Sequence, residues 1–401
     1  MSEQQRYSDE DDPNDPSPLL PILRNRILME GPMPVADYMQ MCLTHPDHGY
    51  YTTTRPIGGR ASANRSGGDF ITAPEVSQMF GEMIAVWCME VWQALGCPAP
   101  FSLVEIGPGR GTLMRDFLRV ARALPGFLEA ADIHLVEISP TLGEQQSLTL
   151  SEHLSRIKWV RDIDQLPDQP IILIGNELLD ALPFRQWVKM GDNWHERAIG
   201  LTPQPQTVHN GAATALHFTT RPNTLVPVPN YDAPDGTIIE TAPAREGFVQ
   251  ALATRLVANQ GAALLIDYGT LENGHAKPSN TFQAMRDHTF VDVLERPGEA
   301  DLTSHVAFEP LVQVAKQAGC VVPPPTTQGA FLAALGIAER CGSLGQSKSP
   351  AVQAQLKSAV ERLVLPSGSG AGEHPNGMGA LFKVFAFGAP ASLGERWPGF
   401  Q

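Results

Sequence analysis

Short apolar runs alternate with helical patterns from residue 101 onwards, and this alternation limits the fold more than any other feature. Each run predicts a buried strand, and each intervening segment predicts a helix. Strands are expected over 102–106, 133–138, 157–160, 170–174 and 262–267, and helices over 112–123 and 142–154. Because strands joined through helices run in one direction, we expect an α/β fold with a doubly wound sheet that has helices on both faces.

The remaining segments add three regions to this sheet. Residues 19–100 have mainly helical patterns, and the clearest helix starts at the capping sequence Thr72-Ala73-Pro74-Glu75 and ends at Gly96. Gly191-Asp192-Asn193 separates two apolar runs and predicts a hairpin. Helical patterns near 302–318, 327–340 and 351–363 predict a separate lobe.

These patterns divide the chain into seven expected segments. They are an acidic tail without structure (1–18), a helical N-terminal region (19–100), the core (101–183), a β-rich insertion (184–236), the remainder of the core sheet (237–300), a helical cap lobe (301–366), and a loop with a closing strand (367–401).

Composition narrows the class of protein. The chain has 29 Lys and Arg against 43 Asp and Glu, a net charge of −14. Such a surface repels phosphate backbones, so we expect no nucleic acid as a partner and a preference for cationic partners. The five cysteines have no CxxC pair and no zinc-binding spacing, so we expect reduced thiols and no metal.

The N-terminus and the apolar runs bear on location. Residues 1–18 contain six acids and one cation, Arg6, whereas a secretory signal starts with basic residues and a transit peptide avoids acids. No apolar run approaches the ~18 residues that a spanning helix needs. We therefore expect a cytoplasmic protein without membrane insertion.

A glycine-rich turn follows the first expected strand of the sheet. Gly107-Pro108-Gly109-Arg110-Gly111 leads from this strand into a helix. Dinucleotide sites have the spacing G-x-G-x-x-G, which requires glycine where this chain has Thr112. The spacing here is G-x-G-x-G, typical of enzymes that bind S-adenosylmethionine, a cofactor without a pyrophosphate. We therefore predict that Gly107, Gly109 and Gly111 bind this cofactor.

Acids at the ends of the next two strands extend the predicted site. Glu137 lies where a ribose would lie and can accept hydrogen bonds from both ribose hydroxyls. Asp162 could accept a hydrogen bond from the adenine amino group, with Ile163 against the ring. Asp162 could equally be an ordinary surface acid in a loop, and the sequence does not decide between the two.

Polar residues after the fourth strand lie where a methyl acceptor is expected. Asn176, Glu177 and Asp180 follow this strand, and ligands of doubly wound sheets bind beyond the carboxyl ends of the strands. Two carboxylates suit a guanidinium, which takes bidentate contacts. The alternative is a helix start at which Asn176 is the cap and Glu177 interacts with the dipole.

Five blocks of the sequence resemble the MidA family. They are residues 68–82, 107–113, 176–183, 296–303 and 378–384, and they occur in the order expected for that family. The family includes the methyltransferase that assists assembly of mitochondrial complex I. The resemblance implies a class I, Rossmann-like methyltransferase fold, S-adenosylmethionine as the cofactor, and symmetric dimethylation of a protein arginine. It also makes a complex I subunit a candidate partner.

The resemblance assigns roles residue by residue. Gly107, Gly109, Gly111 and Glu137 would hold the cofactor, and Glu177 the acceptor. The block at 68–82 would close over the methionine end of the cofactor, with contacts from Thr72 and Gln78.

Two further positions lie near these blocks, His305 and Gln186. His305, just after the block at 296–303, could be a catalytic residue facing the site or a structural residue. Protein arginine methyltransferases have a hairpin with two glutamates, and this chain has Gln186 where the second would fall.

We therefore expect a methyltransferase that acts on a protein arginine, with Glu177, Asn176, Asp180 and His305 as candidate catalytic residues. Two alternatives remain open. A small-molecule methyltransferase acting at oxygen or nitrogen would have the same cofactor turn. A non-catalytic assembly factor could bind the cofactor as a structural ligand.

Overall fold

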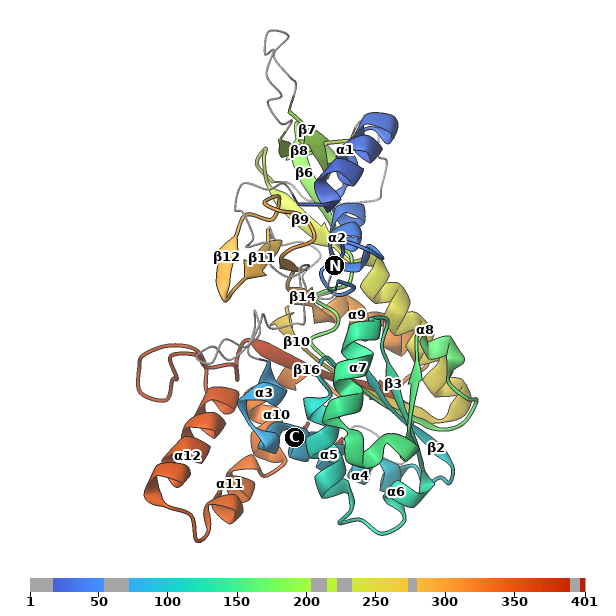
Figure 1. Ribbon diagram of the computed structural model, residues 1–401, viewed down its shortest axis with the longest axis vertical. Coiled ribbons are helices and arrows are strands. Elements are labelled where there is room, and N and C mark those ends of the chain that lie inside the picture. The colour runs from blue at the N-terminus through green and yellow to red at the C-terminus, as the bar shows by residue number, and fades with distance from the viewer. Residues whose placement is uncertain are drawn as a thin grey trace, which may run out of the picture.

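A computed structural model describes residues 17–53, 72–202, 215–221, 233–272, 280–389 and 397–400. Within these residues the centre of the molecule is an eight-stranded sheet with the order β15–β16–β10–β5–β2–β3–β4, and β14 also pairs with β10 (Figure 1). The strands are β2 (Phe101–Ile106), β3 (Ala131–Val136), β4 (Ile157–Val160), β5 (Ile171–Asn176), β10 (Gly261–Thr270), β14 (Val306–Ala307), β15 (Thr326–Thr327) and β16 (Phe382–Gly388).

The direction of the strands confirms the predicted doubly wound fold. β2, β3, β4, β5 and β10 pair in parallel, and each matches one of the five expected strands. The closing strand β16 runs antiparallel to β10. Every residue of β2 and the first eight residues of β10 are buried, as expected for strands covered on both faces.

Helices cover both faces of this sheet. α4 (Gln78–Ala94) and α5 (Thr112–Ala121) bury their apolar sides on one face, where Trp87 and Phe117 belong to the largest core cluster. α8 (Pro243–Asn259) and α9 (Phe308–Gln317) cover the other face. The shorter helices of the core are α6 (Phe127–Ala130), α7 (Pro140–Thr149) and two 3-10 helices, Ser151–Arg156 and Ile163–Gln165.

A second body lies beyond the carboxyl ends of the core strands, at the top of Figure 1. It contains the predicted hairpin, whose strands β6 (Arg185–Met190) and β7 (Asn193–Leu201) pair antiparallel. β1 (Met33–Pro34), β8 (Leu216–Thr220) and β9 (Ile238–Thr241) complete this sheet. The helices α1 (Leu19–Glu30) and α2 (Val35–Thr44) share a core with a small sheet of β11 (Gln283–Arg286), β12 (Thr289–Val291) and β13 (Asp301–Thr303).

The prediction of a single helix from Thr72 to Gly96 is wrong, because this range contains two helices, α3 (Ala73–Val76) and α4. Ser77 has an extended backbone (φ −163°, ψ 141°), and its Oγ accepts a hydrogen bond from the Met79 N–H at the start of α4. The first piece, α3 (Ala73–Val76), is therefore a single turn with its own direction. This break lets α3 lie beside the carboxyl ends of the core strands.

The helix expected over 302–318 begins later than predicted. Residues 301–303 pair with β11 and residues 306–307 pair with β10, so the helix α9 starts at Phe308. α9 packs beside α8 on the core sheet rather than in a separate lobe. Its apolar residues are buried among core strands, which explains why the pattern alone did not place it.

The lobe itself contains α10 (Gln328–Ala334), α11 (Ile337–Gly345) and α12 (Pro350–Val364). Gly336, with φ +87°, separates the first two helices, which the sequence predicted as one. The boundaries of the seven expected segments stay predictions. The acidic tail (apart from residues 17 and 18) and the glycine-rich stretch 58–69 lie outside the described residues.

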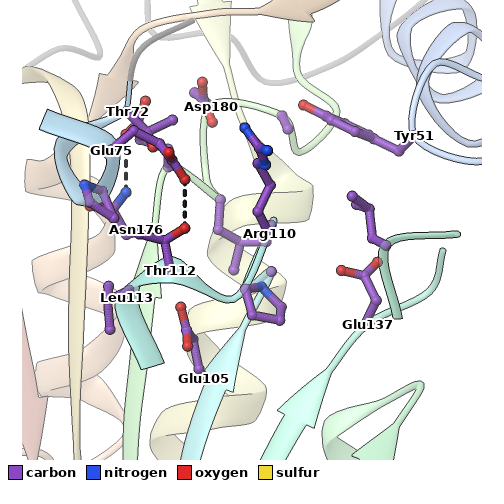
Figure 2. A pocket seen from close by; sticks show the side chains of 18 of the residues that line it. Tyr51, Thr72, Glu75, Glu105, Arg110, Thr112, Leu113, Glu137, Asn176 and Asp180 are labelled. Carbon is purple, nitrogen blue, oxygen red and sulfur yellow. Dashed lines mark hydrogen bonds between the residues drawn. The ribbon is translucent and has the colours of Figure 1, made fainter. Parts of the chain in front are cut away.

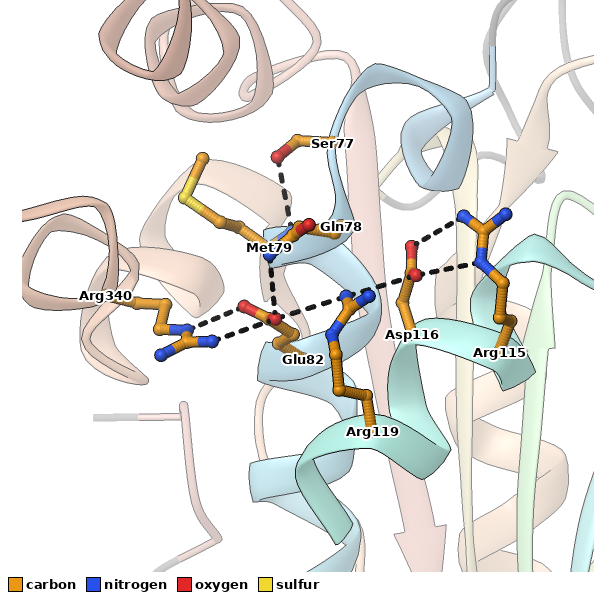
Figure 3. Close-up of polar contacts among 8 residues, drawn as sticks. All are labelled: Ser77, Gln78, Met79, Glu82, Arg115, Asp116, Arg119 and Arg340. Atoms are coloured by element: carbon orange, nitrogen blue, oxygen red, sulfur yellow. Dashed lines mark hydrogen bonds and ion pairs between the residues drawn. The ribbon is translucent and has the colours of Figure 1, made fainter. Parts of the chain in front are cut away.

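A buried carboxylate joins this lobe to the core (Figure 3). Glu82 of α4 is fully buried and accepts two hydrogen bonds from Arg340 of α11, at 2.7 and 3.0 Å. Arg119 of α5 and Gln78 donate to the same carboxylate at 3.2 and 3.1 Å. Several donors on one buried carboxylate fix the lobe against α4, directly after the turn α3.

Candidate functional site

A cavity opens at the carboxyl ends of β2, β3, β5 and β10 (Figure 2). β2 pairs with β3 on one side and with β5 on the other, so the strand order reverses at this point. Doubly wound folds bind their ligands at such a reversal. The lining comes from the glycine turn, the ends of β3, β5 and β10, the start of α3, Tyr50, Tyr51 and Asp301.

The glycine turn has the backbone that its sequence predicts. Gly107, Gly109 and Gly111 all have positive φ, at 64°, 51° and 78°. This region is unfavourable for residues with a Cβ, which explains the three glycines. A Cβ on Gly109 would meet nothing within 4 Å, so this backbone faces open space in the cavity. Gly111 instead begins α5 and packs against Leu150 and Gln146, outside the lining.

Glu137 is held in place at the end of β3. Its Oε1 accepts a hydrogen bond from the Ser139 N–H at 2.8 Å, and its Oε2 accepts one from Gln146 Nε2 at 2.9 Å. Gln146 also donates to the Gly109 carbonyl at 2.9 Å and accepts from Trp159 Nε1. Sequence reasoning missed Gln146, which ties the carboxylate to the glycine turn.

Glu177 has a strained backbone and a perturbed carboxyl group. Its φ is +53°, a conformation that costs a non-glycine residue about 1–3 kcal/mol and is found mostly at functional sites. Burial, together with the nearby carboxylates of Asp180 and Asp301, raises the pKa of its carboxyl to about 8. Asn176 Nδ2 donates to its Oε1 at 3.0 Å and opposes that shift.

Asp180 and Asp301 bring further carboxyl groups to this end of the cavity. Burial raises the pKa of Asp180, and its Oδ1 is buried without a hydrogen-bond partner among the described residues. Asp301 lies on β13, far from Glu177 in the chain, and accepts a hydrogen bond from the Tyr51 hydroxyl at 2.8 Å. Three carboxyl groups therefore converge from two separate segments.

Two buried residues, Asp267 and Arg245, hold the backbone of the segment that carries Glu177 and Asp180. Asp267 of β10 accepts hydrogen bonds from the Leu179 and Asp180 N–H groups at 2.8 and 3.1 Å. Arg245 of α8 donates to the Asp180 carbonyl at 3.2 Å and to the His305 carbonyl at 2.9 Å. These contacts fix the backbone of the segment relative to residues 304–305.

Some predicted site residues lie in the cavity and others do not. Thr72, Gly107, Gly109, Glu137, Asn176, Glu177 and Asp180 line it. Gln78 donates to Glu82 instead. Asp162 caps the 3-10 helix Ile163–Gln165 through the Asp164 N–H, and Ile163 packs on the core beneath. His305 lies beyond Tyr268, with the two ring centroids 5.3 Å apart.

Sequence reasoning also missed Glu105, Asp301 and Tyr51. Glu105 lies two residues before the glycine turn, where burial raises its pKa to about 8, and its Oε2 has no hydrogen-bond partner among the described residues. Asp301 falls within the block at 296–303, which the resemblance singled out without assigning a residue. No sequence signal points to Tyr51, which reaches the site only through the fold.

Comparison with known proteins identifies the family. The family model described as S-adenosyl-L-methionine-dependent methyltransferase matches residues 83–326, more than half of the chain. The chain belongs to this methyltransferase family. The cofactor of the methyltransferase is therefore S-adenosylmethionine, as the glycine turn predicts.

Relatives along nearly the whole chain support this assignment. The methyltransferase is 33% identical over 400 residues to the zebrafish (Danio rerio) protein named "Protein arginine methyltransferase NDUFAF7, mitochondrial", covering 94% of this chain and 88% of that one. It is 34% identical to the human protein of the same name, covering 93% and 85%. A Burkholderia thailandensis structure bound to S-adenosyl-homocysteine is 28% identical, with a TM-score of 0.76 over 93% of this chain and 92% of that one.

The expected cytoplasmic location is wrong, because these relatives are named as mitochondrial. The prediction rested on the composition of residues 1–18, which was compared only with a secretory signal and a typical transit peptide. Among the described residues, no helix is long and apolar enough to cross a lipid bilayer.

Proposed function

We propose that this methyltransferase transfers the methyl group of S-adenosylmethionine to a guanidinium nitrogen of a protein arginine. The observation that carries the proposal is the group of carboxyls at one end of the cavity, formed by Glu177, Asp180 and Asp301. A permanently charged, planar guanidinium suits several carboxylates better than a neutral hydroxyl or amine does. The names of the relatives as arginine methyltransferases support the same acceptor.

We expect residues of the lining to contact the cofactor along its length. Glu137 would accept hydrogen bonds from the ribose hydroxyls, and the open backbone at Gly109 would allow close approach. The unpartnered Oε2 of Glu105 suits the ammonium of the methionine end. When bound, the cofactor supplies an electrophilic methyl group on a sulfonium centre.

The chain's own residues would bind, orient and deprotonate the acceptor. Glu177 and Asp180 would hold the guanidinium with one nitrogen directed toward the cofactor end of the cavity, so positioning supplies much of the rate. A carboxylate at Glu177 draws positive charge to the nitrogens it contacts and leaves lone-pair character on the attacking nitrogen. The released proton then passes to water or to a neighbouring carboxylate.

Glu137→Gln should weaken binding of S-adenosylmethionine roughly 10- to 100-fold, because charge-assisted hydrogen bonds contribute about 1.5–3 kcal/mol each. Calorimetric titration measures the change. Glu144→Gln is the matched control, since this exposed acid on α7 lies outside the lining. Equal losses in the two variants would contradict the assignment of Glu137 to the ribose.

The acid limb of the pH profile should extend to neutral pH. Only ionised Glu177 can bind the guanidinium, and burial raises its pKa to about 8. With cofactor saturating, kcat/KM for the acceptor should rise about tenfold per pH unit below this pKa and level off above it. Asp301→Asn removes a neighbouring negative charge, so it should move the limb to lower pH. A profile that is flat between pH 5 and 8 would exclude Glu177 as the group that must ionise.

Two finer parts of the proposal follow from the resemblance to the MidA family. They are symmetric dimethylation, with one methyl on each terminal nitrogen, and a respiratory complex I subunit as the first acceptor to test. Mass spectrometry of that subunit, isolated with and without this protein, tests both: the arginine mass shows whether methyl groups were added, and fragmentation separates the symmetric isomer, which loses monomethylamine, from the asymmetric one, which loses dimethylamine. An identical arginine mass in the two samples would reject this acceptor.

Labelling a cell lysate with tritiated S-adenosylmethionine tests the proposed class of acceptor. We expect enzyme-dependent label in a protein band. Label in the small-molecule fraction would support a small-molecule methyltransferase instead. No incorporation, with cofactor binding intact, would support a non-catalytic role for the bound cofactor.

A further inference from the structure

The charges around the cavity are unequal. Among the described residues that line it, six are acids: Glu75, Glu105, Glu137, Glu177, Asp180 and Asp301. The same part of the chain contributes a single basic side chain to the lining, that of Arg110. An anionic group of a bound ligand is repelled by the acids and attracted to Arg110.

Arg110 occupies a central place in the cavity. It stands between Gly109 and Gly111 in the glycine turn, above the carboxyl end of β2. Its side chain leaves the turn and extends into the cavity, with its guanidinium on the side of Asp180 and Tyr51 (Figure 2). Since β2 lies between β3 and β5, Arg110 lies between the ribose position at Glu137 and the acceptor position at Glu177.

The cofactor has one anionic group, the carboxylate of its methionine moiety. A ribose at Glu137 and a methyl group directed to Glu177 leave the methionine end over the glycine turn. Glu105, just before the turn, suits the ammonium of that end, and a guanidinium suits the carboxylate through two parallel hydrogen bonds.

We propose that Arg110 binds the methionine carboxylate of S-adenosylmethionine and makes the site selective for cofactors that keep this group. The inference rests on the proposed orientation of the cofactor, with its ribose at Glu137, and not on the identity of the acceptor. It assigns a role to the only residue of the glycine turn that brings a charge.

Calorimetry with two ligands tests the proposal. S-adenosylmethionine and decarboxylated S-adenosylmethionine differ by the carboxylate alone. Arg110→Gln should weaken the first ligand roughly 10- to 100-fold and change the second by less than about twofold, because the lost contact exists for the first ligand only. Arg110→Lys should fall between wild type and Arg110→Gln, since an ammonium keeps the charge without the planar fork.

Arg115→Gln is the matched control. Arg115 lies one turn into α5, pairs with Asp116 and does not line the cavity, so both ligands should bind this variant as they bind wild type. Equal melting temperatures of the ligand-free variants check that the fold is kept. If Arg110→Gln unfolds, the same two-ligand titration of Arg110→Lys tests the proposal.

Three results would overturn the proposal. They are unchanged affinity of Arg110→Gln for S-adenosylmethionine, an equal loss for both ligands, and a change confined to the KM of the protein acceptor. The last result would move Arg110 to the acceptor end of the cavity. A wrong acceptor assignment would leave the binding data as expected, so the two proposals fail separately.

Discussion

Glu177→Gln should lower methyl transfer at least about 100-fold while binding of S-adenosylmethionine stays within about twofold of wild type. The amide keeps the size of the side chain but cannot carry the negative charge that orients the guanidinium. The strained backbone at residue 177 (φ +53°) also fits a functional role, because such strain persists where a side chain must be held in one direction.

The measurement pairs initial rates of labelled methyl transfer with calorimetry of the cofactor. Glu144→Gln serves as the control, because this exposed acid on α7 lies outside the cavity. Turnover of Glu177→Gln equal to that of the control would remove Glu177 from the mechanism. Loss of cofactor binding together with turnover would instead assign Glu177 to the cofactor.

Arg245→Met should lower the free energy of unfolding by about 3 kcal/mol, because breaking a buried network leaves its partners without compensation. Arg245 is 2% exposed and donates to carbonyls on both sides of the acceptor segment. Its charge also favours the ionised forms of Asp180 and Asp267, so the variant leaves two buried acids without this cation.

Urea unfolding measures this change. Arg156→Met is the control, since this exposed arginine also donates to a backbone carbonyl, that of Leu128, far from the site. The control should lose less than about 0.5 kcal/mol. An equal loss of unfolding free energy in the two variants would show that the buried contacts of Arg245 stabilise the fold no more than an exposed contact does.

The core of the fold was predictable because its signal is local. Five apolar runs became five parallel strands, and three glycines at the spacing G-x-G-x-G adopted positive φ. Glu137 followed from its place at the end of the second of these strands. A short stretch of sequence is enough to predict a strand that is buried on both faces of a sheet, or a tight turn that requires glycine.

The errors arose where distant segments decide the structure. The capping sequence at Thr72 predicted one long helix, but Ser77 restarts the helix, and α3 lies against the cavity. Residues 301–303 are too few to give a strand pattern and form β13 only because β11 lies beside them. For the same reason the sequence did not bring Asp301 to Glu177, or Tyr51 to Asp301.

The cofactor contacts predicted for Asp162 and Gln78 stay predictions, because both residues lie outside the lining. Asp162 and Gln78 were chosen for their place in a motif, yet one caps a 3-10 helix and the other donates to the buried Glu82. The position in the sequence predicts which strand end or helix carries each side chain. The hydrogen-bond partner of the side chain depends instead on how the elements pack. Capping and buried ion pairs use the same polar residues as binding sites do.

The acceptor amino acid is the most direct test of the account. A protein labelled by this enzyme with tritiated S-adenosylmethionine is hydrolysed in acid, and its amino acids are separated against methylated standards. The acidic end of the cavity predicts that the label elutes with methylarginines. Label in methyl-lysine or methyl-histidine, or label released as volatile methanol during the hydrolysis, would contradict an arginine acceptor held by Glu177 and its neighbours.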